Sequence, residues 1–443
     1  MQIITELLSV LQNQFSDTNL RYFSIIADSI LSLSRPVTTL SVARMSSLSY
    51  RTVQRLYALK DINWLMVNLL LFKTFVYQQG KVYHLLAADE TVEGKAGKQT
   101  YGIGLFYSSI VQKAIRSINF LAISIIDVEA EKSYFLACQQ VMPIIKASKP
   151  DSKKEKPKNH RPKGRPKGSK NKIKVEPTAN SYQSLKALLG LIMNQLRIFL
   201  PALKCFHLVL DGFYGHENYL LLALSNKLNI ISKFKTNAHL VLPYDGPQSG
   251  KGRPKTKGRK IRLDHIDENY FIKTITDIDS KVITRVYQFK AYTPKILTQL
   301  LNIVILVHTH QVTQKQYRTI LFSNDLTLTE SQIIKYYSLR FQIEFDFRDA
   351  KQFYGLSDFK NYKQTQVTNA VNLSFTMTIL GKLILKKYKI KLGCSTMGIN
   401  DLKTVFKIQK HAHVFFNYNK TEPDDFFNSP QFLNIARLEA IHI

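Results

Sequence analysis

The chain is poor in cysteine and in long apolar runs, and each shortage excludes a class of protein. The 443 residues include only Cys138, Cys205 and Cys394, with no CxxC pair. This spacing argues against a disulfide framework and a structural zinc site, and it suits a reducing cytoplasm. The most apolar runs, at 64–71 and 374–385, are too short to span a bilayer. The first residues also lack the basic start of a secretory signal. We therefore expect a folded cytoplasmic protein without a membrane segment.

Acidic residues are also scarce. The chain has 32 Asp and Glu against 62 Lys and Arg, a formal net charge of +30. Residues 149–174 hold 12 basic and 2 acidic residues, and residues 251–262 hold 7 basic and no acidic ones, so these segments carry +10 and +7. Such a charge predicts a polyanionic partner, and nucleic acid is the first candidate.

Residues 1–80 are expected to be entirely helical, since apolar residues recur there at helical spacing. Within them, residues 38–58 suggest two short helices joined by a turn, the second capped by Ser49. In a helix-turn-helix, Arg51, Gln54 and Arg55 would face a DNA major groove. An ordinary helical hairpin is the equally weighted alternative.

From residue 80 the pattern changes to strands, expected at 82–89, 99–107 and 118–127. Residues 149–177, rich in Lys, Pro and Gly, are expected to form a disordered basic insert. Gly-Arg-Pro-Lys occurs twice, with Arg165 and Lys167 in the first copy and Arg253 and Lys255 in the second. This pattern resembles an AT-hook that enters a narrow minor groove, and nonspecific phosphate binding is the alternative.

The order of elements continues with a helix at 181–199, a strand at 205–211, a helix at 217–228 and a strand at 229–235. Strand–strand–strand–helix–strand–helix–strand–helix is the order of an RNase H-like fold. Four further strand-like segments lie between 270 and 322 and predict an inserted β-domain. Two apolar strands each end on an aspartate, Asp89 and Asp211, which predicts two carboxylates at one edge of the sheet.

Residues 337–351 contain no Gly or Pro and are predicted to form one helix. Spacings of three, four and seven place Tyr337, Arg340, Glu344 and Lys351 along one face. The simplest interpretation is a solvated face with an Arg340–Glu344 ion pair. Because aromatic and aliphatic residues surround this stripe, we favour a polar stripe that lines a cavity.

The Tyr-x2-Arg-x3-Glu-x6-Lys pattern resembles the signature of the IS4-like family of bacterial DDE transposases. The resemblance covers roughly residues 80–355. It implies an α/β, retroviral-integrase-like RNase H core over residues 81–236, with a β-domain inserted at 237–328 and a core helix at 329–360. An all-helical DNA-binding domain at 1–80 and a helical C-terminal region at 361–443 complete the expected organisation.

The resemblance also implies a catalytic site. Asp89, Asp211 and Glu344 would act as catalytic residues and hold two Mg²⁺ ions, for which Mn²⁺ can substitute. Tyr337, Arg340 and Lys351 would contact DNA phosphates. Glu90 is the main rival for a metal ligand, but along a strand it should point to the opposite face.

The expected activity is that of an insertion-sequence transposase. It would bind terminal inverted repeats, cleave at the transposon ends and join them to target DNA, as a homodimer associated with the bacterial nucleoid. The resemblance also implies an aromatic wedge in the inserted β-domain. The only tryptophan, Trp64, lies outside that domain, so Tyr317 is the best-placed substitute. Two alternatives remain open: an RNase H-like nuclease without strand transfer, and a catalytically silent DNA-binding protein derived from a transposase.

Overall fold

The computed structural model describes residues 2–34, 36–46, 48–143, 180–248, 250 and 252–419. Its α-helices are α1 (Gln2–Leu8), α2 (Asp17–Ser32), α3 (Thr39–Met45), α4 (Tyr50–Tyr57), α5 (Trp64–Phe75), α6 (Asn180–Phe199), α7 (Glu217–Ser225), α8 (Glu330–Leu339), α9 (Gln342–Phe353), α10 (Gln364–Leu392) and α11 (Ile399–Asn419). Its strands are β1 (Tyr83–Gly94), β2 (Gly104–Ser108), β3 (Lys113–Asp127), β4 (Lys132–Val141), β5 (Lys204–Leu210), β6 (Asn229–Phe234), β7 (Val241–Pro243), β8 (Lys257–Lys260), β9 (Phe271–Asp277), β10 (Val282–Thr293), β11 (Ile296–His310) and β12 (Gln316–Ser323).

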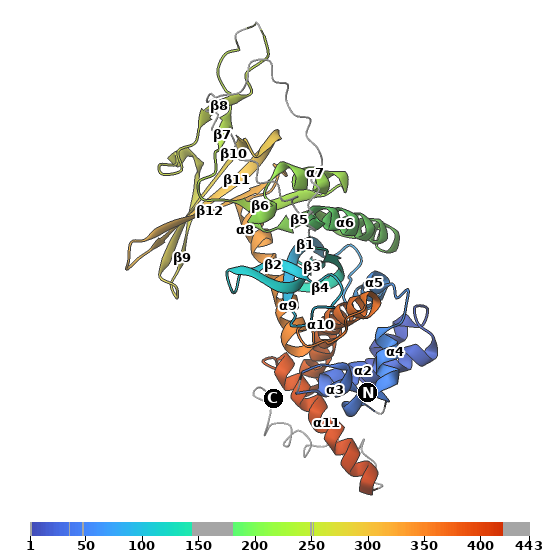
Figure 1. Cartoon of the computed structure of the whole chain (residues 1–443). Helices are drawn as coiled ribbons and strands as arrows, with labels where there is room; N and C mark the ends of the chain where they lie inside the picture. Colours follow the sequence, from blue (N-terminus) through green and yellow to red (C-terminus); the bar gives the residue numbers. More distant parts are fainter. Residues whose placement is uncertain are drawn as a thin grey trace, which may run out of the picture.

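The first 80 residues fold into helices that pack against helices from the other end of the chain. Helix α2 lies on α11, and α4 and α5 lie on α10 (Figure 1). Helix α3 begins with a capping box at Thr38, and α4 begins with Ser49 as its N-cap. The short helices α3 and α4 therefore occupy the residues that were predicted to form a helix-turn-helix. That this region binds DNA stays a prediction.

The central sheet has the strand arrangement of an RNase H-like core. Strand β1 pairs antiparallel with β3, which pairs antiparallel with β4, while β5 pairs parallel with both β1 and β6. Helix α6 packs on β3 and β4, α9 packs on β1, β3 and β4, and α5 and α10 pack on β4. The carboxyl ends of the parallel strands β1, β5 and β6 therefore share one edge of the sheet.

One predicted strand differs from the structure, and one strand was not predicted. The segment predicted at 99–107 is a strand only over Gly104–Ser108, because Gly102 adopts φ +70° in a turn before it. The third core strand is instead β4, over Lys132–Val141, which the sequence interpretation missed. The predicted basic insert at 149–177 lies outside the described residues.

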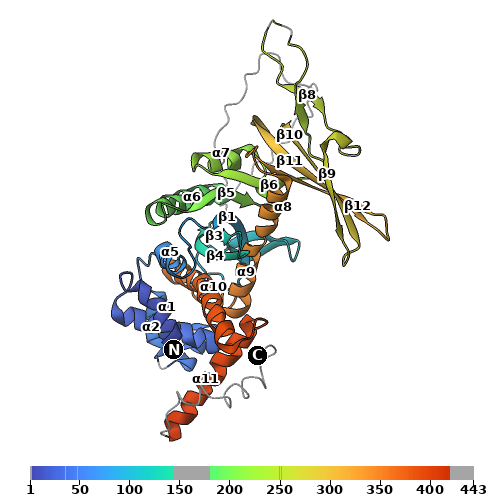
Figure 2. The ribbon, with the colours of Figure 1, turned by 180° about the vertical axis from the view of Figure 1, so that it is seen from behind.

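The strands predicted for the inserted β-domain occur as β9 to β12, but they continue the core sheet. Strand β12 pairs antiparallel with β6, from Ile320 opposite Phe234 to Ser323 opposite Ile231. Strands β11, β10 and β7 follow on the outer side, so the twelve strands form one sheet. The β9–β12 ribbons and the β2–β3 hairpin project toward the same side of the molecule in both ribbon views (Figures 1 and 2).

The predicted single helix over 337–351 is two helices. Helix α8 ends at Leu339 and α9 begins at Gln342, and the joint contains hydrogen bonds of i to i+3 spacing, such as Glu344 N–H to the carbonyl of Phe341. The chain tightens there into a 3₁₀-type turn although no Gly or Pro is present.

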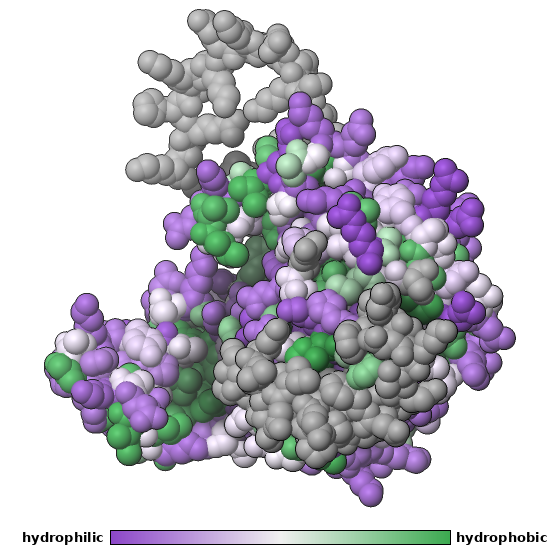
Figure 3. Space-filling model, turned by 90° about the horizontal axis from the view of Figure 1, so that it is seen from below, coloured by the Kyte–Doolittle hydropathy of each residue, from purple (hydrophilic) through white to green (hydrophobic). Residues whose placement is uncertain are grey.

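Helices α10 and α11 account for residues 364–419 of the predicted helical C-terminal region. Within the described ranges, no helix is both long and apolar enough to cross a membrane. Seen from below, a hollow separates the lobe on the left, where the β-ribbons project, from the main body (Figure 3).

Candidate active site

The register of the parallel pair β1 and β5 brings the two predicted aspartates together. Ala88 is opposite Leu210, so the next residues, Asp89 and Asp211, lie side by side at the carboxyl edge of the sheet. Asp211 follows the last residue of β5, as predicted. Asp89 does not end its strand, because β1 continues to Gly94 by pairing with β3.

Arg340 links Asp89 to the third predicted acidic residue. Its Nη1 lies 3.1 Å from Asp89 Oδ2, and its Nη2 lies 2.8 Å from Glu344 Oε1. The side chain of Arg340 is only 11% exposed, and its buried Nε has no hydrogen-bond partner among the residues that the structure describes. The guanidinium therefore holds two carboxylates from β1 and α9 around one buried cation.

Asp211 has its own cationic and hydroxyl partners. Tyr337 donates its hydroxyl hydrogen to Asp211 Oδ1 over 3.4 Å, and Lys233 Nζ on β6 lies 3.5 Å from the same oxygen. Ser232 also donates to the backbone carbonyl of Asp211. Lys233 was not predicted as a site residue. No signal in the sequence of β6 marks Lys233 as the neighbour of Asp211, because the pairing depends on how β5 and β6 lie together.

The two aspartates differ in pKa although they are adjacent. Burial raises the pKa of Asp89 to about 6, helped by the charges of Asp211 and Glu344 and opposed by the Glu90 N–H and Arg340. Burial acts in the same direction on Asp211, but the Gly212 N–H, Lys233 and Arg340 outweigh it and hold its pKa below the ordinary value. For Asp89, the effect of burial on the pKa is therefore larger than the opposing effect of Arg340 and the Glu90 N–H.

Among the residues that the structure describes, no three Asp, Glu, His or Cys side chains are close enough together to hold a metal ion. Arg340 lies between Asp89 and Glu344 in this arrangement. The donor chemistry nonetheless fits a hard divalent cation, since all three side chains offer carboxylate oxygens.

The remaining residue of the polar stripe also faces β1. Lys351 Nζ lies 2.7 Å from Glu93 Oε1, on a carboxylate that is only 7% exposed. Glu90 points elsewhere, since it accepts hydrogen bonds from Asn119 and Tyr214. The four stripe residues therefore all turn toward the β1–β5 edge, and Glu90 does not join them. Glu93 was missed because nothing in its sequence context marks it as the partner of Lys351.

The predicted DNA-contact residues outside this edge are mostly exposed. Arg51, Gln54 and Arg55 lie on the exposed side of α4, and Arg253 and Lys255 are exposed before β8. Arg165 and Lys167 lie outside the described residues. Tyr317, on β12, is 55% exposed and stacks on His308 with ring centroids 4.4 Å apart. Because the start of β12 extends past Phe234, the last residue of β6, Tyr317 lies toward the same sheet edge as the carboxylates.

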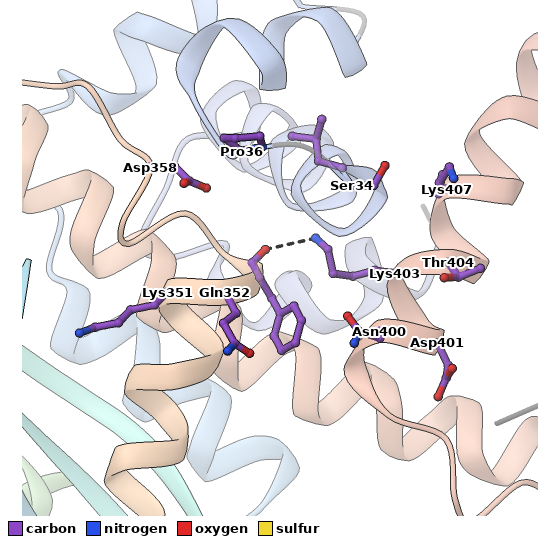
Figure 4. A pocket seen from close by; sticks show the side chains of 12 residues that line it. Ser34, Pro36, Lys351, Gln352, Asp358, Asn400, Asp401, Lys403, Thr404 and Lys407 are labelled. Atoms are coloured by element: carbon purple, nitrogen blue, oxygen red, sulfur yellow. Dashed lines mark hydrogen bonds between the residues drawn. The ribbon is translucent and has the colours of Figure 1, made fainter. Parts of the chain in front are cut away.

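A pocket of the described residues lies elsewhere, with a volume of about 470 Å³ between the α2–α3 connection, the end of α9 and the start of α11 (Figure 4). Lys403 spans it and donates to the carbonyls of Ile30 and Phe353. Burial lowers the pKa of Lys403 to about 8. Lys403 thus clamps three helical segments together. The open edge with its carboxylates is the better candidate for chemistry on a long polymer, which cannot enter a closed pocket.

Comparison with known proteins agrees with the geometry. A family model described as DDE superfamily endonuclease matches residues 11–291, more than half of the chain. The matched range includes Asp89 and Asp211 and ends before Glu344. No curated protein matches the chain. Nucleases of this superfamily are of the transposase type, act on DNA and typically use divalent metal ions. The chain therefore belongs to the DDE superfamily endonuclease family, and its central sheet is the RNase H-like core of such a nuclease.

Proposed function

We propose that the protein is the transposase of an IS4-like bacterial insertion sequence. One observation carries the proposal. The side chains of Tyr337, Arg340 and Glu344 gather at the sheet edge that holds Asp89 and Asp211, and Lys351 pairs with Glu93 farther along β1. A solvated helix face does not explain a buried guanidinium that pairs with two carboxylates.

Asp89, Asp211 and Glu344 would hold two Mg²⁺ ions. Bound there, the ions would activate the attacking oxygen and stabilise the leaving oxygen of the phosphodiester. Arg340 keeps Asp89 and Glu344 near one another. Tyr337 and Lys233 hold Asp211 ionised and oriented.

DNA recognition is proposed to use the basic segments and the N-terminal helices. Arg51, Gln54 and Arg55 on α4 would read terminal inverted repeats, and Arg253 and Lys255 would contact the backbone. The segment 149–174, with its charge of +10, would add phosphate contacts. Deleting it should flatten the slope of log K against log salt, since counterion release scales with the phosphates neutralised.

The assignment is tested on DNA that carries the ends of the element. The substrate is a labelled duplex with the inverted repeat that flanks the gene, and a scrambled duplex of equal length is its control. We expect Mg²⁺-dependent cleavage at the repeat boundary, followed by joining of the 3′ end to a supercoiled target plasmid. Cleavage of both duplexes without joining would favour a nuclease without strand transfer. Binding without cleavage would favour a silent transposase relative.

Second-strand processing and dimerisation complete the proposal. Resemblance to the family suggests a hairpin at the transposon end, formed in a homodimer, with Tyr317 as the aromatic residue that holds a flipped base. Tyr317→Ala should leave first-strand nicking intact and lower the hairpin yield. Tyr270→Ala, which alters a β-region aromatic packed on Phe289, is the matched control.

A further inference from the structure

The β2–β3 hairpin is a ribbon that leaves the body of the sheet. Strand β1 stops pairing with β3 at Ser117, and the earlier residues of β3, Lys113 to Arg116, pair with β2. A two-stranded ribbon is marginally stable in water when it has no further partner. The hairpin projects in both ribbon views (Figures 1 and 2), so a bound partner would stabilise it.

The exposed residues of this hairpin are unusually apolar. Leu105 and Tyr107 are 73% and 65% exposed, and Ile110 at the turn is 89% exposed, with Val111 beside it at 49%. Arg116 is opposite Leu105 in the register, so a cation shares the face of the apolar residues. Several large apolar side chains of this hairpin are thus exposed to solvent next to one another. Such a patch indicates an interaction surface.

The charge of the hairpin selects the kind of partner. Residues 95–117 contain four Lys and Arg and no Asp or Glu, and Lys98, Lys113 and Arg116 are exposed. A second copy of this surface would be repelled by the same charges, whereas a polyanion would be attracted. Apolar residues at the end of a basic ribbon are what proteins insert between base steps of a DNA minor groove.

A second hairpin provides the contrast. Ile278, in the turn between β9 and β10, is 83% exposed, but Asp277 and Asp279 flank it. Carboxylates on both sides of an apolar tip disfavour approach to phosphates. The two hairpin tips therefore have similar exposure, and they differ in the charge of the residues around them.

The hairpin extends β3 beyond the residues that pair with β1, in the direction that leads away from Asp89. Asp89 is opposite Ala122 on β3, and twelve residues separate Ala122 from Ile110 at the tip of the turn. At about 3.3 Å per residue this is at most about 40 Å, or about twelve base pairs of B-form DNA.

We propose that the β2–β3 hairpin is a DNA-binding arm whose tip, Ile110 and Val111, inserts into the minor groove within about twelve base pairs of the cleaved bond. The proposal rests on the DNA-cleaving function proposed above. The arm would hold and bend the duplex while Asp89, Asp211 and Glu344 act on the phosphate. Tyr107 and Arg116 would contact the sugar–phosphate backbone beside the insertion.

The test compares two hairpin tips that are similarly exposed and whose neighbouring residues have opposite charge. Ile110→Ser with Val111→Ser alters the arm, and Ile278→Ser is the control on the acidic tip. Substitution of exposed apolar residues should leave folding intact, which circular dichroism checks. Each full-length protein is titrated with end-bearing duplexes that contain single 2-aminopurine substitutions within twelve base pairs (about one helical turn) on either side of the cleavage site.

For the wild type and the control we expect a fluorescence increase at one or two positions within about twelve base pairs of the cut, because an inserted side chain unstacks a base. The arm variant should lose this increase and bind about tenfold more weakly. A normal signal and affinity in the arm variant, with wild-type cleavage intact, would overturn the arm and leave the proposed function standing. Loss of dimerisation with unchanged DNA signals would assign the hairpin to a protein interface instead. No DNA binding by the wild type would overturn both proposals.

Discussion

Helix α9 takes part in two ion-pair clusters whose acidic residues are only two positions apart, and the two clusters behave differently. Glu344 belongs to the open cluster with Arg340 and Asp89, and its side chain is 37% exposed. Asp346 belongs to a closed cluster, where it is fully buried and paired with Lys382 on α10. The same kinds of charge thus stand on one helix with opposite access to solvent.

The closed cluster is complete and the open one is not. Ser124 donates to Asp346 over 3.0 Å, and Lys382 donates both to Asp346 and to the carbonyl of Ser133. In the open cluster the buried Arg340 Nε has no partner among the residues that the structure describes, and the pKa of Asp89 is raised. A complete buried network fixes α9 on the sheet, whereas an incomplete network with a perturbed carboxyl group is typical of a functional site.

The sharpest way to test this contrast is to remove the charges of the open cluster. Asp89→Asn, Asp211→Asn and Glu344→Gln should each lower Mg²⁺-dependent cleavage of end-bearing DNA by at least roughly a thousandfold, since each removes a metal-binding carboxylate. DNA affinity and melting temperature should change little. Cleavage rates are measured on labelled duplexes under single-turnover conditions. A variant that still cleaves at near wild-type rate removes that residue from the site.

Substitutions in the closed cluster should lower the free energy of unfolding and should not act on the cleavage reaction itself. Lys382→Met leaves Asp346 buried without its cation, and we expect a loss of roughly 3–5 kcal/mol in the free energy of unfolding. Urea denaturation followed by tryptophan fluorescence of Trp64 measures this loss, because Trp64 donates to Asn369 on α10 and reports on its packing.

The double variant Lys382→Met with Asp346→Leu is the matched control. Replacing both charges of a buried pair by apolar groups is often neutral, so most of the lost stability should return. Restored stability with normal cleavage identifies the closed cluster as structural. Restored stability with cleavage still lost would show that the contrast between the clusters is wrong, because Asp346 would then serve the reaction.

Acidity provides a finer test, because the neutral form of Asp89 cannot bind a cation. The pKa of Asp89 is raised to about 6, so the carboxyl group is protonated below that value and charged above it. Cleavage should therefore fall as the pH drops through about 6, by up to tenfold per pH unit. Mn²⁺ affinity, measured over the same range, should fall in parallel. A midpoint near the ordinary aspartate value would contradict the electrostatics described for this edge.

The sequence could predict which side chains come together because the signals are local. Apolar segments followed by an aspartate and polar residues at spacings of three, four and seven are visible without tertiary information, and the structure places Asp89, Asp211 and Arg340 together. Their catalytic role stays a prediction. The break between α8 and α9 was not predictable, since neither Gly nor Pro marks it and the local backbone hydrogen bonds decide it.

Features that depend on distant partners were missed. The pairing of Lys351 with Glu93 joins residues 258 positions apart, and Lys382 meets Asp346 across two helices. Strand β12 shows periodicity in the sequence, but periodicity does not show that the strand pairs with β6 and continues the core sheet. Amphipathic patterns predict which face is buried and leave open what covers it.

The smallest expected effect concerns Glu90, which adjoins Asp89 in sequence but faces Asn119 and Tyr214. Glu90→Gln keeps an oxygen acceptor for Tyr214 and removes only the charge, so cleavage should change less than about threefold. The same single-turnover assay measures Glu90→Gln beside Asp89→Asn. Equal losses in the two variants would mean that Glu90 also serves the metal site, and the open cluster would then extend to both faces of β1. A small loss of cleavage in Glu90→Gln would show that the reaction takes place on the face of β1 that Arg340 and α9 cover.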